Sequence, residues 1–260
     1  MAAIVYGRRV PYAWTWNEET FVLVPALVLA YALAVRRLGA PRWRIACFGA
    51  AAVLLLAAGV SPLHELSLRY LLLVHLLLNV VLAEWAPLLL VLAVPSALAA
   101  ELTRPCVVRL LTRPVVALPL WLANYALWHV PVLYDAALRR PHTLLHLEHL
   151  LYLATGVLLW WPVVHDVPRR LSAGARALYV FAGFVLAAPI GLVLALVPHA
   201  IYATYRHAPE RLLGLSALSD QQLGGVAMAG EQAIVFFAVF TVWFFRFLAE
   251  QEHSDGDLPR

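Results

Sequence analysis

The chain of 260 residues contains no lysine, so all 19 of its basic residues are arginines. Charged residues of either sign make up only 13% of the sequence, whereas soluble domains carry roughly a quarter. The arginines stand singly or in pairs, so the sequence has no basic patch of the kind that binds nucleic acid. This scarcity of charge excludes a soluble domain of any size and predicts that no nucleic acid is a partner.

Sulfur-containing residues are also scarce. Cys47 and Cys106 are too few for a disulfide framework, and they do not form a CxxC pair. Met228 is the only methionine besides the first residue, which argues against a methionine-rich relay for Cu(I). Arg8 and Arg9 are not followed by the short apolar core of a signal peptide. We therefore expect the first hydrophobic segment to be retained as a helix.

The polar residues contain no nucleophile–base motif, phosphate-binding loop or catalytic pair of carboxylates. We therefore expect that the protein is not an enzyme. A transporter is the third-ranked hypothesis, because the sequence has no inverted repeat and few charges in the middle of its apolar segments.

Apolar residues make up 63% of the chain, and the mean hydropathy is +0.80. Most of the apolar segments approach the ~20 residues that a helix needs to cross the hydrocarbon core of a bilayer. These segments are residues 21–35, 43–60, 71–94, 115–133, 145–164, 177–197 and 226–248. The sequence predicts an all-α membrane helix bundle of about seven transmembrane helices in contact with lipid. Residues 1–249 form its single domain, and residues 250–260 form a polar tail that we expect to be disordered.

The arginines also predict the orientation of this bundle. Loops rich in positive charge face the cytoplasm. One side holds Arg36, Arg37, Arg42, Arg44, Arg104, Arg109, Arg113, Arg169, Arg170, Arg176, Arg246 and Arg260, and the other holds Arg8, Arg9, Arg69, Arg139, Arg140, Arg206 and Arg211. The first group is larger, so we expect the N-terminus outside and the C-terminus in the cytoplasm.

With this orientation, the histidines concentrate near the outer face and the cysteines lie on the cytoplasmic side. Only His165 and His253 are expected inside. The outer histidines are His64, His75, His129, His142, His146, His149, His199 and His207. Imidazole is a suitable ligand for copper, zinc and iron. The outer layer of the membrane domain therefore offers metal ligands without thiols.

Helical spacing narrows this set. His142, His146 and His149 point within ~60° of one another on one helix, and His75 and His129 come from other helices at a similar depth. We predict a metal site formed by His75, His129, His146 and His149. The alternative for the buried members is a structural hydrogen bond between helices. Four other histidines are interpreted as interfacial residues that reach water, namely His64, His142, His199 and His207.

Several carboxylates could support such a site. Carboxylates often orient metal-binding imidazoles through their second nitrogen. The candidates on the same side are Asp135, Glu148, Asp220 and Glu231. Glu84 lies within a predicted span, where it either relays protons or pairs with an arginine or a tryptophan. Pro87 lies in the same span, and we expect neighbouring helices to satisfy the carbonyl group that it leaves without a donor.

Short motifs along two-thirds of the chain resemble those of the CtaG-type cytochrome c oxidase assembly factors. They are HLLL at 75–78, APLL at 86–89, WHVP at 128–131, LYDAAL at 133–138, HLEHL at 146–150, WWPV at 160–163, IYATY at 201–205, GLSAL at 214–218 and DQQLGG at 220–225. The motifs follow the order in which the family has them, on a pattern of seven helices.

This resemblance implies an assembly factor for a haem–copper cytochrome c oxidase. Such a protein would hold copper at an outer histidine site and deliver it to the catalytic subunits of the oxidase, or mature their metal centre, in the inner (plasma) membrane. The alternative is a membrane electron carrier that binds haem between two histidines.

The sequence departs from the family pattern in two places. The family commonly has another histidine one turn before His75, where this chain has Leu71 and Leu72. After DQQLGG the family usually has MWVPG, but this chain reads MAGEQ at 228–232, which contains Glu231. If the missing histidine is a ligand elsewhere in the family, Glu231 or another outer histidine must take its place here for copper to bind.

Overall fold

A computed structural model describes residues 4–5, 8–9, 12, 14 and 17–256. Six helices in this part of the chain are long and apolar enough to cross a membrane, and a bent pair of helices makes a seventh if it counts as one span. The predicted all-α bundle of about seven transmembrane helices is confirmed.

The spans are joined by short helices at both ends of the bundle. In chain order the helices are α1 (Glu18–Leu38), α2 (Arg42–Gly59), α3 (Pro62–Arg69), α4 (Leu72–Val80), the π-helix η1 (Val81–Trp85), α5 (Ala86–Ala93), α6 (Ser96–Leu102), α7 (Cys106–Leu111), α8 (Pro114–Trp128), α9 (Pro131–Arg139), the π-helix η2 (Pro141–Leu145), α10 (His146–Val164), α11 (Ala173–Leu196), α12 (Ala203–Arg206) and α13 (Ala217–Gly256). Strands β1 (Ile4–Val5) and β2 (Arg8–Arg9) form a short antiparallel pair. The third span is continuous through α4, η1 and α5, and η2 continues into α10.

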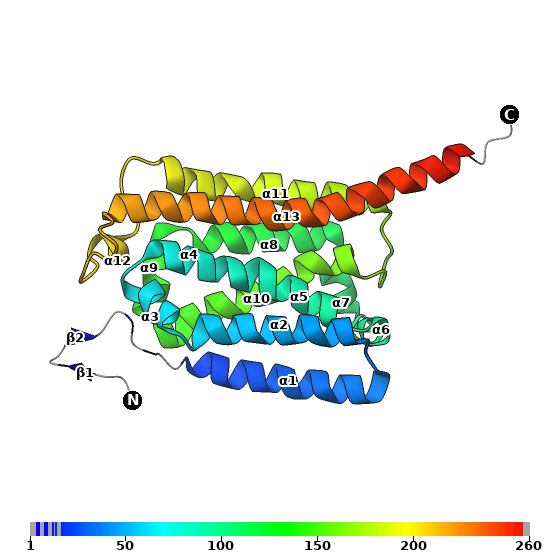
Figure 1. The fold of residues 1–260 in the computed structure, drawn as a ribbon, viewed down its shortest axis with the longest axis horizontal. Coiled ribbons are helices and arrows are strands. Elements are labelled where there is room, and N and C mark those ends of the chain that lie inside the picture. Colours follow the sequence, from blue (N-terminus) through cyan, green and yellow to red (C-terminus); the bar gives the residue numbers. More distant parts are fainter. Residues whose placement is uncertain (1–3, 6–7, 10–11, 13, 15–16, 257–260) are drawn as a thin grey trace.

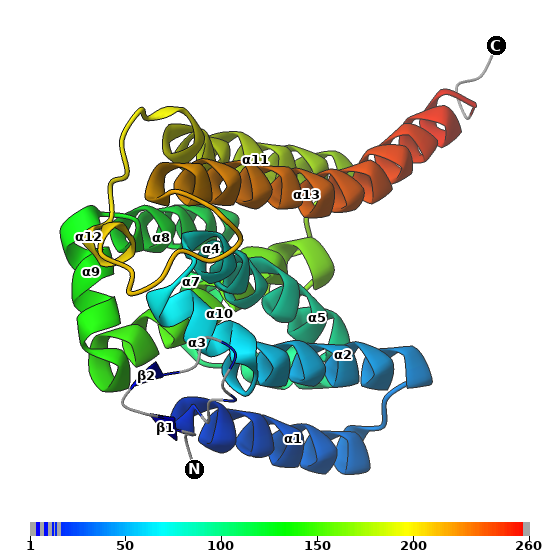
Figure 2. The same ribbon diagram turned by 60° about the vertical axis from the view of Figure 1, so that its left-hand side comes forward.

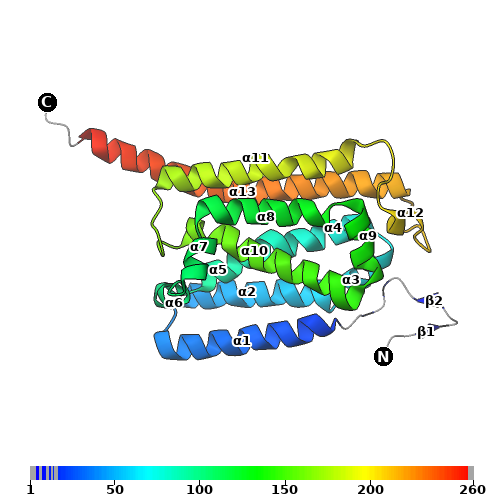
Figure 3. The ribbon, with the colours of Figure 1, turned by 180° about the vertical axis from the view of Figure 1, so that it is seen from behind.

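The spans lie alongside one another, with α1 and α2 on one side of the bundle and α11 and α13 on the other (Figures 1 and 2). The third span, α8 and α10 lie between these two pairs. Helices α3, α9 and α12 lie together at one end of the bundle, which we call the histidine end, and α6 and α7 lie at the opposite end (Figure 3). Helix α13 extends past the opposite end (Figure 1). The assignment of the histidine end to the outer face stays a prediction from the arginines.

The distribution of side chains is that of a protein surrounded by lipid. Large apolar side chains point outward along the spans, and Val22, Leu178 and Phe237 are each at least 67% exposed. In contrast, Glu84 and Gln232 are completely buried. A soluble protein rarely exposes apolar patches of this extent, so the outer surface of the bundle faces hydrocarbon.

The fourth predicted span, residues 115–133, is not one straight helix. Helix α8 ends at Trp128, and α9 starts at Pro131 with a bend of 73° between the two. Pro131 has no N–H group and restricts the preceding residue to an extended conformation, and Val130 adopts it with φ −65° and ψ 122°. The predicted span is therefore broken by this bend, and His129 lies at the corner.

The C-terminal tail also differs from expectation. Helix α13 continues to Gly256, so residues 250–256 are helical and the prediction of disorder is wrong for them. The remaining predicted tail, residues 257–260, lies outside the described residues. The last turns of α13 extend away from the bundle (Figure 1).

The centre of the bundle is built around the π-helix of the third span. Pro87 cannot donate a hydrogen bond to the carbonyl oxygen of Ala83 four residues earlier. Trp121 of α8 donates its Nε1–H to this oxygen at 3.3 Å, and Trp160 of α10 donates to the carbonyl oxygen of Glu84 at 2.9 Å. The expectation that neighbouring helices satisfy the carbonyl left by Pro87 is confirmed. These two indole bonds connect three helices at one level.

A glycine lets α10 approach this level closely. A Cβ atom on Gly156 would lie 2.3 Å from the carbonyl oxygen of Ala83 and 2.6 Å from Cγ of Pro87. Both are backbone or ring atoms that cannot rotate away. In contrast, a Cβ atom on Gly230 of α13 would meet no atom within 4 Å.

Substitution Gly156→Ala is expected to separate α10 from the third span and lower the free energy of unfolding by about 1–3 kcal/mol, the usual cost of overpacking. The midpoint of thermal unfolding in detergent measures this effect. Gly230→Ala is the control and should leave the midpoint unchanged or slightly raised. A Gly156→Ala protein as stable as the Gly230→Ala protein would contradict this packing.

His165 follows the last turn of α10 at the end opposite the histidine end. Its side chain is buried, and its Nε2–H donates to the carbonyl oxygen of Val91 at 3.0 Å. Burial lowers the pKa of the imidazole to about 4. The folded protein therefore keeps this imidazole neutral at pH values where the unfolded chain, with a pKa of about 6.5, binds a proton.

Because the folded-state pKa is depressed, the stability associated with neutral His165 is complete above about pH 6.5 and falls as the pH falls toward 4. We expect the wild-type protein to lose about 2 kcal/mol more than His165→Gln between pH 7.5 and pH 5. Thermal unfolding midpoints of both proteins across this range measure the difference. Parallel pH profiles would show that His165 does not titrate as its burial requires.

Candidate functional site

Two aspartates hold the helix starts at the histidine end. Asp220 of α13 accepts hydrogen bonds from the N–H groups of Leu72 and Leu73, at 2.7 and 3.0 Å, at the start of α4. Asp135 of α9 accepts bonds from the N–H groups of Ala203 and Thr204, at 3.0 and 2.9 Å, at the start of α12. Carboxylates stabilise helix starts because the first N–H groups have no partner in the helix. The suggestion that these two aspartates orient imidazoles is therefore wrong.

The loop between α11 and α13 covers this end of the bundle. Tyr205 donates its hydroxyl hydrogen to the carbonyl oxygen of Ser67, and Tyr202 donates to the carbonyl oxygen of His129 at 3.1 Å. Both tyrosine side chains are buried. The Asp135 contacts thus hold α12 where its tyrosines reach α3 and the α8–α9 corner.

Substitution Asp135→Ala removes the acceptor for two backbone N–H groups and the Thr204 hydroxyl. Hydrogen bonds to a charged group contribute about 1.5–3 kcal/mol, so we expect the loop around α12 to open more often. Hydrogen–deuterium exchange at residues 203–207 should rise by at least about tenfold. Glu210→Ala, an exposed carboxylate in the same loop, is the control. Equal exchange in the two variants would contradict the anchoring role.

His75 lies in the first half of α4 and is almost completely buried. Its Nδ1 lies 3.3 Å from the carbonyl oxygen of Ser67. Since a carbonyl oxygen only accepts, Nδ1 carries the hydrogen, and Nε2 is the nitrogen that could act as a ligand. This Nε2 atom is buried without a hydrogen-bond partner, 4.0 Å from Oε1 of Glu148. Glu148 in turn accepts a bond of 3.1 Å from Asn79.

His129 at the α8–α9 corner has the same arrangement. Its Nδ1–H donates to the carbonyl oxygen of Tyr125 at 2.7 Å, and its Nε2 is buried without a partner. The ring of Tyr134 lies near both imidazoles, with its centroid 5.0 Å from that of His75 and 6.4 Å from that of His129. Two imidazoles with an unpartnered Nε2 therefore lie near one tyrosine ring.

His149 in the first turn of α10 pairs with a residue that the sequence interpretation did not include. Its Nδ1 lies 3.1 Å from Oε2 of Glu19 at the start of α1. The Nε2 atom of His146 lies 3.9 Å from the same oxygen. Asn17 caps α1, and its side chain accepts a hydrogen bond from the backbone N–H of Glu19 at 3.0 Å. This cap fixes the first turn of α1, which carries the Glu19 side chain. A carboxylate bonded to one imidazole nitrogen leaves the other to act as a ligand.

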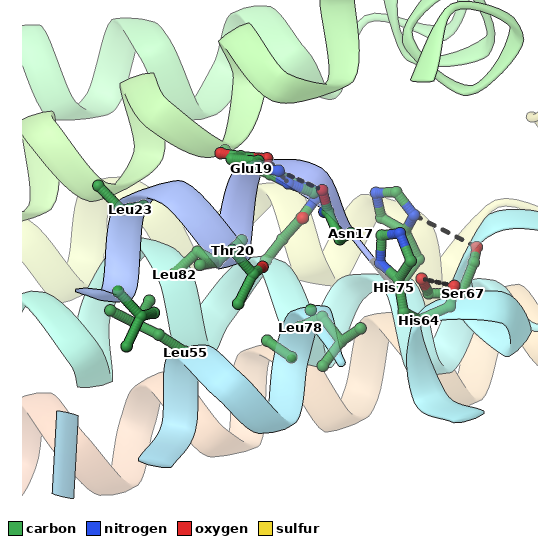
Figure 4. A pocket seen from close by; sticks show the side chains of 15 residues that line it. Asn17, Glu19, Thr20, Leu23, Leu55, His64, Ser67, His75, Leu78 and Leu82 are labelled. Atoms are coloured by element: carbon green, nitrogen blue, oxygen red, sulfur yellow. Dashed lines mark hydrogen bonds and ion pairs between the residues drawn. The ribbon is translucent and has the colours of Figure 1, made fainter. Parts of the chain in front are cut away.

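One small pocket lies between His75, His149 and Glu19. It has a volume of about 30 Å³, and its polar lining consists of Asn17, Glu19, Thr20, His64, Ser67, His75, Asn79 and His149. Figure 4 shows the His64 and His75 side chains together, with Asn17 and Glu19 coming from the start of α1. The structure therefore brings His75 and His149 to one pocket and places His146 beside Glu19. His129 does not line this pocket.

His64 corrects one interpretation of the sequence. The sequence predicts an interfacial residue that reaches water, but His64 is only 8% exposed and lines the pocket. Burial and the nearby imidazoles of His149, His75 and His146 lower the pKa of His64 to about 3. The ring is therefore neutral at physiological pH. The other three histidines in this group, His142, His199 and His207, are exposed as expected.

The histidines do not form a complete metal site in this conformation. Among the described residues, no three histidine, cysteine, aspartate or glutamate side chains are grouped closely enough to hold one metal ion. The ligand chemistry suits copper or zinc, since His64, His75 and His149 are neutral or hydrogen-bonded imidazoles around one cavity. Glu231 does not line this pocket and accepts a bond from Trp85, so it does not take the place of the histidine missing before His75. His64 is the outer histidine that shares the pocket with His75.

A second polar group lies deeper in the bundle. Gln232 of α13 donates to Oε1 of Glu84 at 2.6 Å and to the hydroxyl oxygen of Tyr125 at 3.0 Å. Glu84 therefore pairs with an amide rather than with an arginine or a tryptophan. Its Oε2 atom is buried without a hydrogen-bond partner. These contacts connect η1, α8 and α13 below the histidine end.

The fold and these residues define a multi-span membrane protein whose bundle carries a pocket lined by histidines at one end. A model of the family described as "Cytochrome c oxidase caa3 assembly factor" matches residues 29–250. The chain belongs to this family, and the resemblance seen in its motifs is confirmed. No match to a curated protein or to a solved structure was found.

Proposed function

We propose that this member of the caa3 assembly-factor family holds copper transiently at the histidine end and passes it to the catalytic subunits of the oxidase in the plasma membrane. The family supports the role in oxidase assembly. Copper binding is supported mainly by one feature that His75, His129 and His149 share, the hydrogen bonding of Nδ1. In each of them an oxygen accepts from Nδ1 and leaves Nε2 as the potential ligand atom.

His75 and His149 would be the first ligands, because both line the pocket. His64 lines the same pocket and is kept neutral by burial, so it can replace the histidine that this chain lacks before His75. Glu19 and the Ser67 carbonyl would hold the rings through Nδ1, and His146 would approach from the Glu19 side. His129 would receive the ion only after a movement at the α8–α9 corner.

Copper suits this pocket better than haem does. A volume of about 30 Å³ holds an ion with one water molecule but has no room for a porphyrin. Bound copper would be coordinated by imidazole nitrogens, which accept it readily as Cu(II). Because the ligands are not grouped in this structure, side chains must rearrange when copper binds, and this rearrangement lowers the affinity for copper. A loosely held ion is what a donor protein needs in order to release it.

The metal part of this proposal is tested with detergent-purified protein loaded with copper and washed. We expect the double variant His75→Ala/His149→Ala to retain copper at least about tenfold more weakly than the wild type. His207→Ala, an exposed histidine in the covering loop, is the control and should bind as the wild type does. If neither the wild type nor the variants bind copper after loading, the protein does not carry the metal.

The assembly role is tested in cells that lack this protein. The oxidase should lose activity and its normal haem spectrum, and the wild-type and His207→Ala chains should restore both. The His75→Ala/His149→Ala chain should restore neither, although it reaches the membrane in normal amounts. Unchanged oxygen consumption and haem spectra in the deletion cells would contradict a role in oxidase assembly.

A further inference from the structure

A large cavity lies at the end of the bundle opposite the histidine end. It has a volume of about 1060 Å³ and opens between α2, α5, the α10–α11 loop and α13. Neither the histidines nor the Glu84 group contributes to it. Its lining combines two kinds of side chain that seldom occur together in a soluble pocket, namely a group of arginines and a wall of leucines and valines.

Four arginines line the cavity: Arg44, Arg170, Arg176 and Arg246. Two carboxylates, Asp166 and Glu250, also line it, so the arginines are in excess. Asp166 is shared, since Arg176 bonds to one of its oxygens and Arg170 lies 4.0 Å from the other. The cavity therefore carries a net positive charge.

Two of these arginines are fixed in place by the fold. Arg44 donates its Nη1–H groups to the carbonyl oxygens of Leu92, at 2.8 Å, and Val94 at the end of α5. Arg176 is buried and donates to the carbonyl oxygen of Val163 at 3.3 Å. Carbonyl partners do not neutralise a guanidinium, so Arg44 keeps its full charge at the wall of the cavity.

The other two arginines, Arg170 and Arg246, are exposed and can reach a ligand in the cavity. The guanidinium of Arg246 stacks over the Trp243 ring, 4.7 Å from its centroid, and Arg176 stacks over the same ring at 4.3 Å. Trp43 lines the cavity from the α2 side. Arginine binds phosphate oxygens through paired N–H groups, and tryptophan favours the headgroup region of a bilayer.

The apolar part of the lining continues along the spans. Leu88 and Leu92 come from α5, and Val239 and Val242 come from α13. All four belong to helices that cross the membrane. The arginines lie toward the ends of these spans, where lipid headgroups would be, and the apolar wall runs along the spans, where acyl chains would be.

We infer that this cavity is a binding site for one anionic phospholipid, with the phosphate group at Arg170 and Arg246 and an acyl chain along the wall of α5 and α13. A soluble phosphate ester would satisfy the arginines but would leave the apolar wall open. A zwitterionic lipid would cover the wall but would compensate the charge less well. Basic pockets between transmembrane helices bind anionic headgroups in this way.

Native mass spectrometry of the full chain in detergent tests the inference. The probes are dimyristoylphosphatidylglycerol, dimyristoylphosphatidylcholine and glycerol 3-phosphate. We expect one molecule of the anionic lipid to bind more tightly than the zwitterionic lipid, and glycerol 3-phosphate to show no retained adduct. This comparison uses the wild-type protein alone and does not depend on the folding of any variant.

The variant Arg170→Gln/Arg246→Gln should bind the anionic lipid about 30-fold more weakly, because each arginine near a headgroup contributes about a fivefold factor. The matched control is Arg109→Gln/Arg169→Gln, two exposed arginines outside the cavity at the same end. Circular dichroism verifies that both proteins are folded. Equal binding of the two lipids, wild-type binding by the Arg170/Arg246 variant, or retention of glycerol 3-phosphate as strong as that of the lipid would overturn the inference.

Discussion

Lipid offers no hydrogen bonds, so each polar group inside the bundle must find its partner within the chain. This constraint explains the central packing. The carbonyl oxygen of Ala83 loses its helical donor at Pro87 and receives one from Trp121. The first N–H groups of α4 are held by Asp220. The Nε2 atoms of His75 and His129 are among the buried atoms that have no partner, as is Oε2 of Glu84, and an ion in the pocket would give Nε2 of His75 one.

The two ends of the protein then have different chemistry. At the histidine end, three imidazoles and one carboxylate line a pocket of ion size. At the opposite end, arginines and tryptophans line a cavity of lipid size. The motifs of the family contribute both to the scaffold and to the histidine end, since Trp160 serves packing, Asp220 caps α4, and His75 lines the pocket. The proposed copper site would therefore depend on the few side chains that this scaffold brings to the pocket.

The sequence predicted the helical class, most of the span limits and the concentration of histidines at one end, because hydrophobic length and residue type determine these features directly. It did not predict the break at Pro131, although the residue before a proline favours extended backbone. It also placed Asp135 and Asp220 near imidazoles, whereas both bond to backbone N–H groups. Hydropathy gives the depth of a residue but not the direction of its side chain.

The pocket itself was only partly predictable. His75 and His149 were identified from their depth and helical spacing, but His64 and Glu19 were not. His64 belongs to α3, a short helix between two spans that folds back against α4, and Glu19 comes from the start of α1. No spacing in the sequence connects these segments. Their meeting follows from contacts between helices that are far apart in the chain.

The central claim is that imidazoles from α3, α4 and α10 share one copper ion. Pulsed electron paramagnetic resonance of the protein loaded with one equivalent of Cu(II) tests it directly, because the modulation of the echo reports the number of coordinated imidazoles. We expect three coordinated imidazoles, from His64, His75 and His149, with one lost in each of His75→Ala and His149→Ala. A copper signal without imidazole modulation, or one unchanged in both variants, would contradict it.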